Sequence, residues 1–295
     1  MKDQATNLRE LINSFRQNNN KIISMNKKPE NSARVLAIAS GKGGVGKTNF
    51  TINLGIALSN KGKKITVIDA DLGLGNIDVV LGMIPKQTLA NVIRGEASII
   101  DIIMKGPKGI NIISGGSGIT DMIDLSKQEI DNLINNFYML NEISDYILID
   151  TGAGINNSVV SFIEAADEVI IIITPEPTSI TDAYAIIKNI RHKNKSIKLV
   201  INRIESSNEG REVFNKISSA TKRFLDFEVE NLGFIYEDSS VKKSVKLQKP
   251  FILKFPNSVA SKGIDMAAYN LINNQTQIKD ISSFKRFINN LFNRI

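Results

Sequence analysis

The feature that most constrains this chain is a glycine-rich loop at residues 41–48. The four fixed positions of the motif G-x-x-x-x-G-K-[ST] are occupied by Gly41, Gly46, Lys47 and Thr48. An apolar run at residues 35–39 precedes the loop and indicates a buried strand, while residues 49–58 carry apolar side chains at helical spacing. Glycines allow backbone N–H groups to close around a polyphosphate, and the start of the following helix adds partial positive charge. The pattern therefore predicts a nucleotide-phosphate site between a strand and a helix.

The loop supplies both backbone and side-chain ligands for a nucleoside triphosphate. We expect contacts to the nucleotide from Gly41, Lys42, Gly43, Gly44, Val45, Gly46, Lys47, Thr48 and Asn49. Lys47 should reach the β- and γ-phosphates, and the hydroxyl of Thr48 should bind Mg²⁺.

A second lysine, Lys42, directly follows the first glycine of the loop. Residues 42–48 therefore read K-G-G-x-G-K-T, which resembles the deviant phosphate loop of the MinD/ParA family of ATPases. The resemblance implies that the substrate is ATP with Mg²⁺, and that Lys42 reaches across a dimer to the nucleotide of the partner subunit. It also implies that Lys42 and Lys47 are both catalytic, and that the chain is a monomer until ATP binding makes it a homodimer. The alternative for Lys42 is a solvated surface lysine.

Three aspartates follow predicted strands, at the edge where parallel sheets hold their ligands. Asp69 and Asp71 come after the strand at residues 64–68 and project the same way, because they are two residues apart. Asp71 resembles the family's catalytic aspartate, which orients the attacking water, and we expect Asp69 close to Mg²⁺. Asp150 ends the apolar run at residues 146–149 and fits the Walker B pattern, in which it contacts Mg²⁺ directly or through water. Turn or capping residues are the alternative for these aspartates.

Two more segments complete the predicted site. Residues 72–78 resemble the corresponding MinD segment and are predicted to form a switch that moves with the γ-phosphate. Asn202 follows the strand at residues 198–201 and resembles the family's adenine-reading asparagine, since an amide can both donate to and accept from adenine. An asparagine that only turns the chain after a strand is the alternative.

Composition limits the other classes of protein. The 295 residues include no cysteine, which excludes disulfides, thiolate metal sites and the iron–sulfur clusters carried by some proteins with this loop. The net charge of +7 favours a polyanionic partner, either anionic lipid or nucleic acid. No apolar stretch approaches the ~18 residues of a transmembrane helix, and the N-terminus does not resemble a secretory signal. We therefore expect a cytoplasmic protein.

Strand-like and helix-like segments alternate along residues 34–275. This order predicts a doubly wound α/β fold, a mostly parallel sheet with helices on both faces, as in P-loop NTPases of the MinD/ParA type. Within it, we expect helices at residues 89–104 and 257–273 and a short strand at residues 109–113.

The N-terminal residues 1–16 predict an amphipathic helix, and residues 17–33 a flexible linker. The opening residues D-Q-A-x-x-L-R resemble the segment at the start of the FlhG family, MinD-like regulators of flagellar number in which this segment stimulates the GTPase FlhF. The matching residues are Asp3, Gln4, Ala5, Leu8 and Arg9. The resemblance implies an FlhF-type GTPase as partner, with flagellar switch or basal-body components as further candidates. An amphipathic leader without such a partner is the alternative.

The last residues, 276–295, predict a second amphipathic helix with flanking cations. Its apolar face includes Phe284, Phe287, Ile288, Leu291 and Phe292. Phenylalanines beside lysine and arginine fit a helix that lies in a membrane surface, and MinD and FlhG end in such a segment. A helix docked on the chain's own core is the alternative.

These features together support one functional hypothesis. The chain is predicted to be a dimerising ATPase that hydrolyses ATP to ADP and phosphate and regulates flagellum assembly at the inner face of the cell membrane. A septum-positioning MinD is an alternative that the N-terminal segment disfavours. A ParA-type partition ATPase that binds DNA is another, but no sequence-specific nucleic acid is expected. A non-enzymatic scaffold is disfavoured by the intact Lys42, Lys47, Thr48, Asp71 and Asp150.

Overall fold

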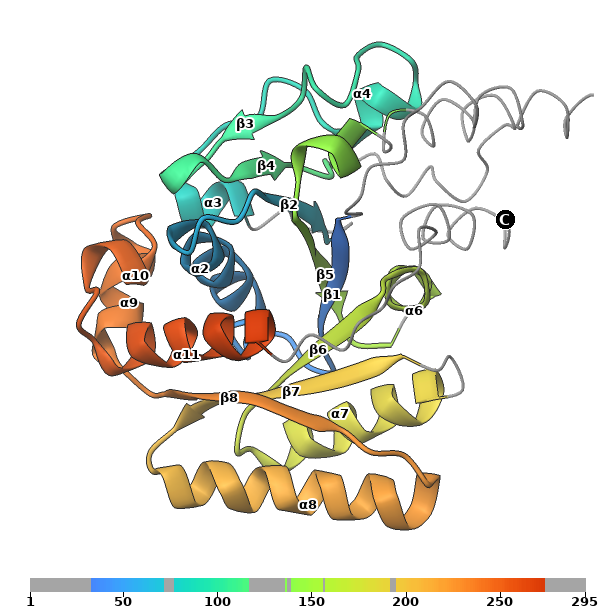
Figure 1. The fold of residues 1–295 in the computed structure, drawn as a ribbon, viewed down its shortest axis with the longest axis vertical. Coiled ribbons are helices and arrows are strands. Elements are labelled where there is room, and N and C mark those ends of the chain that lie inside the picture. The colour runs from blue at the N-terminus through green and yellow to red at the C-terminus, as the bar shows by residue number, and fades with distance from the viewer. Residues whose placement is uncertain are drawn as a thin grey trace, which may run out of the picture. The chain divides into compact units, whose positions relative to one another are not determined.

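The computed structural model describes residues 33–71, 77–116, 136, 139–155, 157–191 and 195–273. These residues form a layered α/β domain around an eight-stranded sheet (Figure 1), in the spatial order β3-β4-β2-β5-β1-β6-β7-β8. The strands are β1 Arg34–Ser40, β2 Ile65–Ala70, β3 Met104–Lys105, β4 Asn111–Ile113, β5 Tyr146–Ala153, β6 Glu168–Ile173, β7 Ser196–Ile204 and β8 Glu230–Tyr236.

The strand that precedes the glycine-rich loop lies at the centre of the sheet. β1 pairs in parallel with β5 on one side and with β6 on the other. The neighbouring pairs are also parallel, apart from β3 and β4, which form an antiparallel edge. Strands buried on both faces read as continuous apolar runs, which is why residues 35–39 and 146–149 contain no alternating polar positions. The parallel arrangement brings the carboxyl ends of β1, β2, β5 and β7 to one edge, where the site lies.

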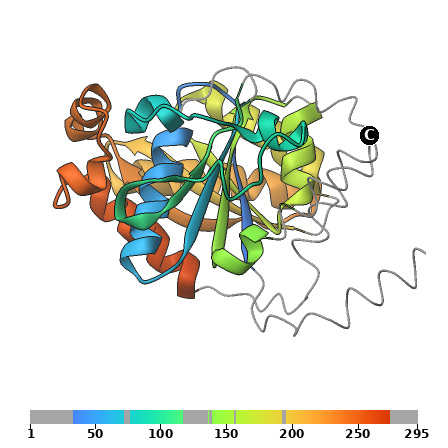
Figure 2. The ribbon, with the colours of Figure 1, turned by 90° about the horizontal axis from the view of Figure 1, so that it is seen from above.

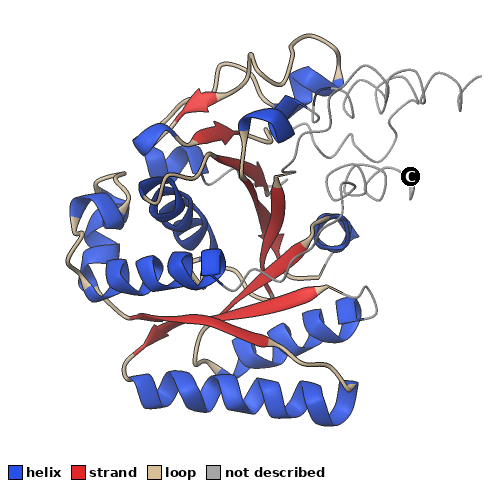
Figure 3. Ribbon diagram, viewed as in Figure 1, coloured by secondary structure: helices blue, strands red, loops and turns tan. Residues whose placement is uncertain are grey.

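Helices cover both faces of the sheet, as Figures 2 and 3 show. They are α2 Lys47–Asn60, α3 Ile77–Leu81, α4 Leu89–Ile93, α6 Asn157–Ala165, α7 Pro177–Ile190, α8 Ser207–Leu225, α9 Ser239–Lys246, α10 Phe251–Lys254 and α11 Val259–Asn273. Successive side chains of β1 enter opposite cores: Leu36 packs with α2 and α11, and Val35 packs with α6 and α7. The predicted doubly wound fold is confirmed.

One predicted helix is too long. Residues 89–104 were expected to be one helix, but α4 ends at Ile93 and the chain then turns. Gly95 has a φ of 71°, a left-handed conformation that ends the helix and that glycine adopts without strain. The strand expected at residues 109–113 is present as β4, and the closing helix expected from residue 257 begins at Val259.

The amino edge of the sheet, opposite the loop, contains a cluster of buried charges. The Glu168 carboxylate lies between the Arg34 guanidinium, whose Nε donates at 2.9 Å, and the Lys198 ammonium at 2.8 Å. The Glu168 and Lys198 side chains are each only 1% exposed. Burial raises the pKa of Glu168, but the charges of Arg34 and Lys198 outweigh burial and hold this pKa below its ordinary value.

Among the described helices, none combines the length and the apolar character needed to cross a bilayer.

Candidate active site

The loop between β1 and α2 is held at one end and open in its middle. Gly44 and Gly46 have φ values of 78° and 95°, which favour glycine over any residue with a side chain. A Cβ atom added to Gly41 would lie 2.3 Å from the Cβ of Asp182 on α7, so only glycine allows this close approach. A Cβ added to Gly43 or Gly44 would meet nothing within 4 Å. The open middle provides the cradle for phosphates that the motif predicts.

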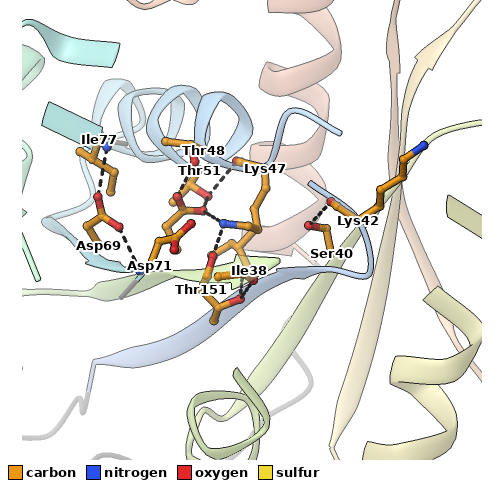
Figure 4. A network of polar contacts seen from close by, with 12 residues as sticks. Ile38, Ser40, Lys42, Lys47, Thr48, Thr51, Asp69, Asp71, Ile77 and Thr151 are labelled. Atoms are coloured by element: carbon orange, nitrogen blue, oxygen red, sulfur yellow. Dashed lines mark hydrogen bonds and ion pairs between the residues drawn. The ribbon is translucent and has the colours of Figure 1, made fainter. Parts of the chain in front are cut away.

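The start of α2 and the end of β5 meet in a polar cluster beside this cradle (Figure 4). Asp150 is fully buried, and its carboxylate accepts hydrogen bonds from the hydroxyls of Thr48 at 2.7 Å and Thr51 at 3.0 Å. The Lys47 ammonium lies 3.1 Å from the same carboxylate and also donates to the carbonyl of Thr151. A buried carboxylate needs such partners, since an unpaired charge in this position would be strongly destabilising.

The oxygen atoms of this cluster fit a magnesium ion. The Thr48 hydroxyl and the Asp150 carboxylate are hard ligands that lie 2.7 Å apart at the helix start. Mg²⁺ prefers such oxygens, and it commonly takes one or two from the protein and the rest from phosphates and water. The described residues contain no group of three or more His, Cys, Asp or Glu side chains suited to a metal, so the fit rests on this pair.

Asp69 and Asp71 follow β2 at the same edge but lie in different environments. Asp69 is fully buried, and its carboxylate accepts the backbone N–H groups of Asp71 and Ile77, each at 3.1 Å (Figure 4). Asp69 therefore holds both ends of the segment that connects β2 to α3. Asp71 is only half-buried, and its Oδ1 would lie 3.7 Å from a Cβ added to Gly152 after β5. Asp71 thus faces the end of the strand that carries Asp150.

Lys42 points away from this cluster (Figure 4). Its ammonium lies 2.7 Å from the Glu176 carboxylate and 3.4 Å from the Thr178 hydroxyl, and its side chain is 44% exposed. The hydrogen bond and the positive charge of Lys42 lower the pKa of Glu176. Lys42 therefore contacts the start of α7, whereas Lys47 contacts β5.

Asn202, at the end of β7, contacts the loop itself. Its side-chain amide donates to the carbonyl of Val45 at 2.7 Å, and its Nδ2 would lie 2.6 Å from a Cβ added to Gly46. This contact ties β7 to the other end of the loop, where it leads into α2. The predicted reading of adenine by Asn202 stays a prediction.

Comparison with known proteins identifies the family. A family model described as ParA, NUBPL iron-transfer P-loop NTPase, matches residues 31–272. This chain belongs to the ParA family. The MinD/ParA assignment made from the loop is confirmed, and the chain is a P-loop ATPase. The 295 residues contain no cysteine, so none of them can be a thiolate ligand of an iron–sulfur cluster.

Individual proteins that resemble this chain include flagellar regulators and a MinD. The chain is 44% identical over 230 residues to the antiactivator FleN of Pseudomonas aeruginosa, covering 77% of this chain and 82% of FleN. It is 37% identical over 275 residues to the flagellum site-determining protein YlxH of Helicobacter pylori, covering 92% and 91%. Among solved structures, the septum site-determining protein MinD of Pyrococcus horikoshii in complex with Mg-ADP matches with a TM-score of 0.68 and 26% identity, covering 84% of this chain and 99% of MinD.

The structure brings together most of the predicted ParA-family site residues. Lys47, Thr48 and Asp150 form one cluster, and Asp71 lies beside it. Asp69 was expected near Mg²⁺; its carboxylate accepts two backbone amides, and its metal role stays a prediction. Three sets of predicted residues lie outside the described part of the chain. They are residues 72–76 of the predicted switch at 72–78, the partner-binding residues Asp3, Gln4, Ala5, Leu8 and Arg9, and the membrane residues Phe284, Phe287, Ile288, Leu291 and Phe292.

Sequence reasoning missed three residues of the ParA-family site. Thr51 donates to Asp150, Thr151 accepts from Lys47, and Glu176 pairs with Lys42. Thr51 could have been found, because it lies one helical turn after Lys47. Glu176 stands between two prolines directly after β6, a position at the ligand-binding edge that also signals a role.

Proposed function

We propose that this chain is an FlhG-type ATPase in which Mg-ATP binding drives dimerisation and so regulates flagellum assembly. The observation that carries the proposal is that the two lysines of the loop contact different parts of the molecule. Lys47 lies in the cluster of its own chain, whereas Lys42 extends out of it toward α7. Similarity to FleN and YlxH supports the flagellar role, and the D-Q-A-x-x-L-R segment supports an FlhF-type GTPase as partner.

The residues of the cluster have separate tasks in hydrolysis. Mg-ATP, when bound, supplies the phosphoryl group and a cation that neutralises part of its charge. With nucleotide bound, Lys47 would exchange Asp150 and Thr151 for the phosphates, and Thr48 and Asp150 would hold Mg²⁺. Asp71 accepts a hydrogen bond from the attacking water and orients it.

Lys42 acts on the second subunit. The exposed carboxylate of Glu176 holds the Lys42 ammonium outside the phosphate cradle of its own subunit. Lys42 can exchange Glu176 for the phosphates of the nucleotide bound to the second subunit. The exchange makes nucleotide and dimer interdependent, because each subunit then completes the site of the other.

The terminal segments connect the ATP cycle to location and partner. Residues 1–16 engage the GTPase, and residues 276–295 bind the inner face of the membrane. One short amphipathic helix binds lipid weakly, whereas two helices in one dimer bind more tightly, since the second insertion is effectively intramolecular. ATP therefore favours the membrane-bound state.

The experiment compares Lys42→Ala with Lys47→Ala. Lys42→Ala should bind ATP as a monomer and lose both ATP-driven dimerisation and hydrolysis, whereas Lys47→Ala should lose ATP binding itself. Nucleotide binding is followed by fluorescence, dimerisation by light scattering and hydrolysis by phosphate release. Normal ATP-dependent dimerisation of Lys42→Ala would overturn the role given to Lys42.

A further inference from the structure

A cleft of about 710 Å³ lies at the amino edge of the sheet, away from the ATP site. It is bordered by the turn after α2, by β3 and β4, and by the residues that precede β5. Its apolar part includes Ile100, Ile103 and Ile143, of which Ile100 is exposed and the other two are half-buried. A cleft with an open apolar part can take an amphiphile.

The polar part of the cleft is basic. Its charged lining residues are Lys63, Lys64 and Lys105, against the single carboxylate of Glu142. Within the described part of the chain, neither Lys63 nor Lys64 forms a side-chain ion pair. The excess of positive charge selects an anionic ligand.

One of these lysines is held in place by a buried side chain. The Lys105 ammonium donates to the Asn111 amide oxygen at 2.7 Å, and the Asn111 amide donates to the Thr66 hydroxyl at 3.3 Å. Asn111 is 94% buried, since its relative exposure is 6%. An ammonium has three donors, so this contact orients Lys105 and leaves donors for an anion.

Stabilisation of a helix end can explain the positions of only two of the three lysines in the cleft. Lys63 and Lys64 follow the C-terminus of α2, where cations interact favourably with the last carbonyls of a helix. Lys105 lies on β3, and the helix end does not account for its place, nor for the exposed isoleucine beside it.

The cleft shares its edge with both ends of the described domain. Arg34 at the start of β1 and Ile65 at the start of β2 are both level with Tyr146 of β5. The Arg34 guanidinium donates to the carbonyl of Leu271, near the end of α11, at 3.1 Å. The chain that leads to the predicted membrane helix therefore departs from the same edge as the cleft.

We infer that this cleft binds an anionic phospholipid, with the phosphate on the three lysines and the first part of the acyl chains against the isoleucines. The inference rests on the proposed membrane association and adds to it a second lipid contact, made by the ATPase domain itself. A domain that binds lipid through both its terminal helix and this cleft keeps one fixed orientation on the membrane. A domain attached by the terminal helix alone could rotate freely.

The first test uses the full chain with ATP and vesicles that contain phosphatidylglycerol. Lys63→Gln/Lys64→Gln should reduce the sedimented fraction, equivalent to a roughly thirtyfold loss of affinity, because each of the two lysines near an anionic surface contributes about 1 kcal/mol. Lys216→Gln/Lys222→Gln on α8 is the charge-matched control and should bind nearly as the wild type does. Both variants should keep wild-type ATP hydrolysis without lipid. Equal losses in the two variants would overturn the cleft, since the effect would then follow net charge alone.

The second test separates the cleft from the terminal helix. Amide NMR spectra of the full chain are titrated with monomeric dihexanoyl phosphatidylglycerol and, separately, with inorganic phosphate. Saturable shifts around residues 62–65 and 105–111 with the lipid, much weaker with phosphate, are expected. No shift there, or an equal response to phosphate, would overturn the phospholipid assignment. Shifts in the cleft without vesicle binding of the wild type would retain the cleft and refute the membrane step of the proposed function.

Discussion

Two clusters of buried charge lie at opposite edges of one sheet, and they differ in what surrounds them. At the amino edge, Glu168 is enclosed by Arg34 and Lys198. At the carboxyl edge, Asp150 is paired with Lys47 and with the hydroxyl of Thr48. Each cluster contains a carboxylate that is almost or fully inaccessible, so burial of charge does not distinguish them.

The difference lies in the space beside each cluster. Glu168 connects three adjacent strands, because Arg34 is on β1, Glu168 on β6 and Lys198 on β7. The cluster at Asp150 borders the open glycine loop, so Lys47 can exchange its present partners for a ligand. The first arrangement stabilises the sheet, whereas the second is prepared for exchange. An adjacent cradle, and not buried charge alone, identifies the functional site.

The largest effect is expected from Asp71→Ala at the carboxyl edge. This variant retains the phosphate cradle and loses the group proposed to orient the attacking water, so hydrolysis should fall by about 10²–10⁴-fold while ATP binding persists. Phosphate release and fluorescent-nucleotide binding measure the two quantities. The control is Asp265→Ala, an exposed aspartate on α11 that pairs with Lys61 and should leave both unchanged. Normal turnover by Asp71→Ala would remove this residue from the mechanism.

The two edges also differ in how far the sequence predicts them. The carboxyl edge was largely predictable, because Lys47 and Thr48 occupy fixed positions of the phosphate-loop motif, and Asp150 ends an apolar strand at the edge where parallel sheets hold their ligands. The amino-edge cluster was not, since Arg34 and Glu168 are 134 residues apart and meet only through strand order. Apolar runs predict that strands exist, but which strands are neighbours depends on the packing of the whole chain.

Local conformation explains the remaining differences. The helical spacing of apolar residues predicted one helix over residues 89–104. Gly95 ends α4 instead, because its φ is left-handed. Glu176 has no local pattern that marks it as the partner of Lys42, since the contact spans 134 residues. Short-range rules thus predict elements and motif roles, and they do not predict long-range side-chain pairs.

At the amino edge, Glu168→Gln should act on stability and leave catalysis intact. The substitution leaves Lys198 buried with less negative charge, which should lower the free energy of unfolding by about 3 kcal/mol. Hydrolysis per folded molecule should stay at the wild-type value. Urea unfolding and phosphate release measure the two properties. Glu228→Gln, which breaks the exposed pair with Lys222, is the control and should unfold like the wild type. A selective loss of activity in Glu168→Gln would show that the two edges are coupled.

The pH dependence of stability sharpens the same comparison. The pKa of Glu168 is below its ordinary value of 4.5 in the folded protein, so its contribution to stability is fully present above pH 4.5. That contribution is lost as the pH falls through the lowered folded-state pKa. The unfolding free energies of wild type and Glu168→Gln should therefore differ at pH 6.5 and converge below pH 4.5. A constant difference across this range would mean that ionisation of Glu168 is not what stabilises the cluster.

The smallest effect is expected from Glu176→Gln, which removes the carboxylate that holds Lys42. The pair is exposed on both sides, so its loss should hardly change the thermal stability of the monomer. In the proposed dimer, Glu176 competes with the phosphates of the second subunit for Lys42. Without this carboxylate, ATP-driven dimers should form at roughly two- to fivefold lower protein concentration, the scale of a weak surface ion pair. Light scattering across a dilution series measures this shift. Glu228→Gln again serves as control, since its pair with Lys222 has the same 2.7 Å separation and lies on α8 and its following turn. Weaker dimerisation of Glu176→Gln would mean that this carboxylate contributes to the dimer and does not restrain Lys42.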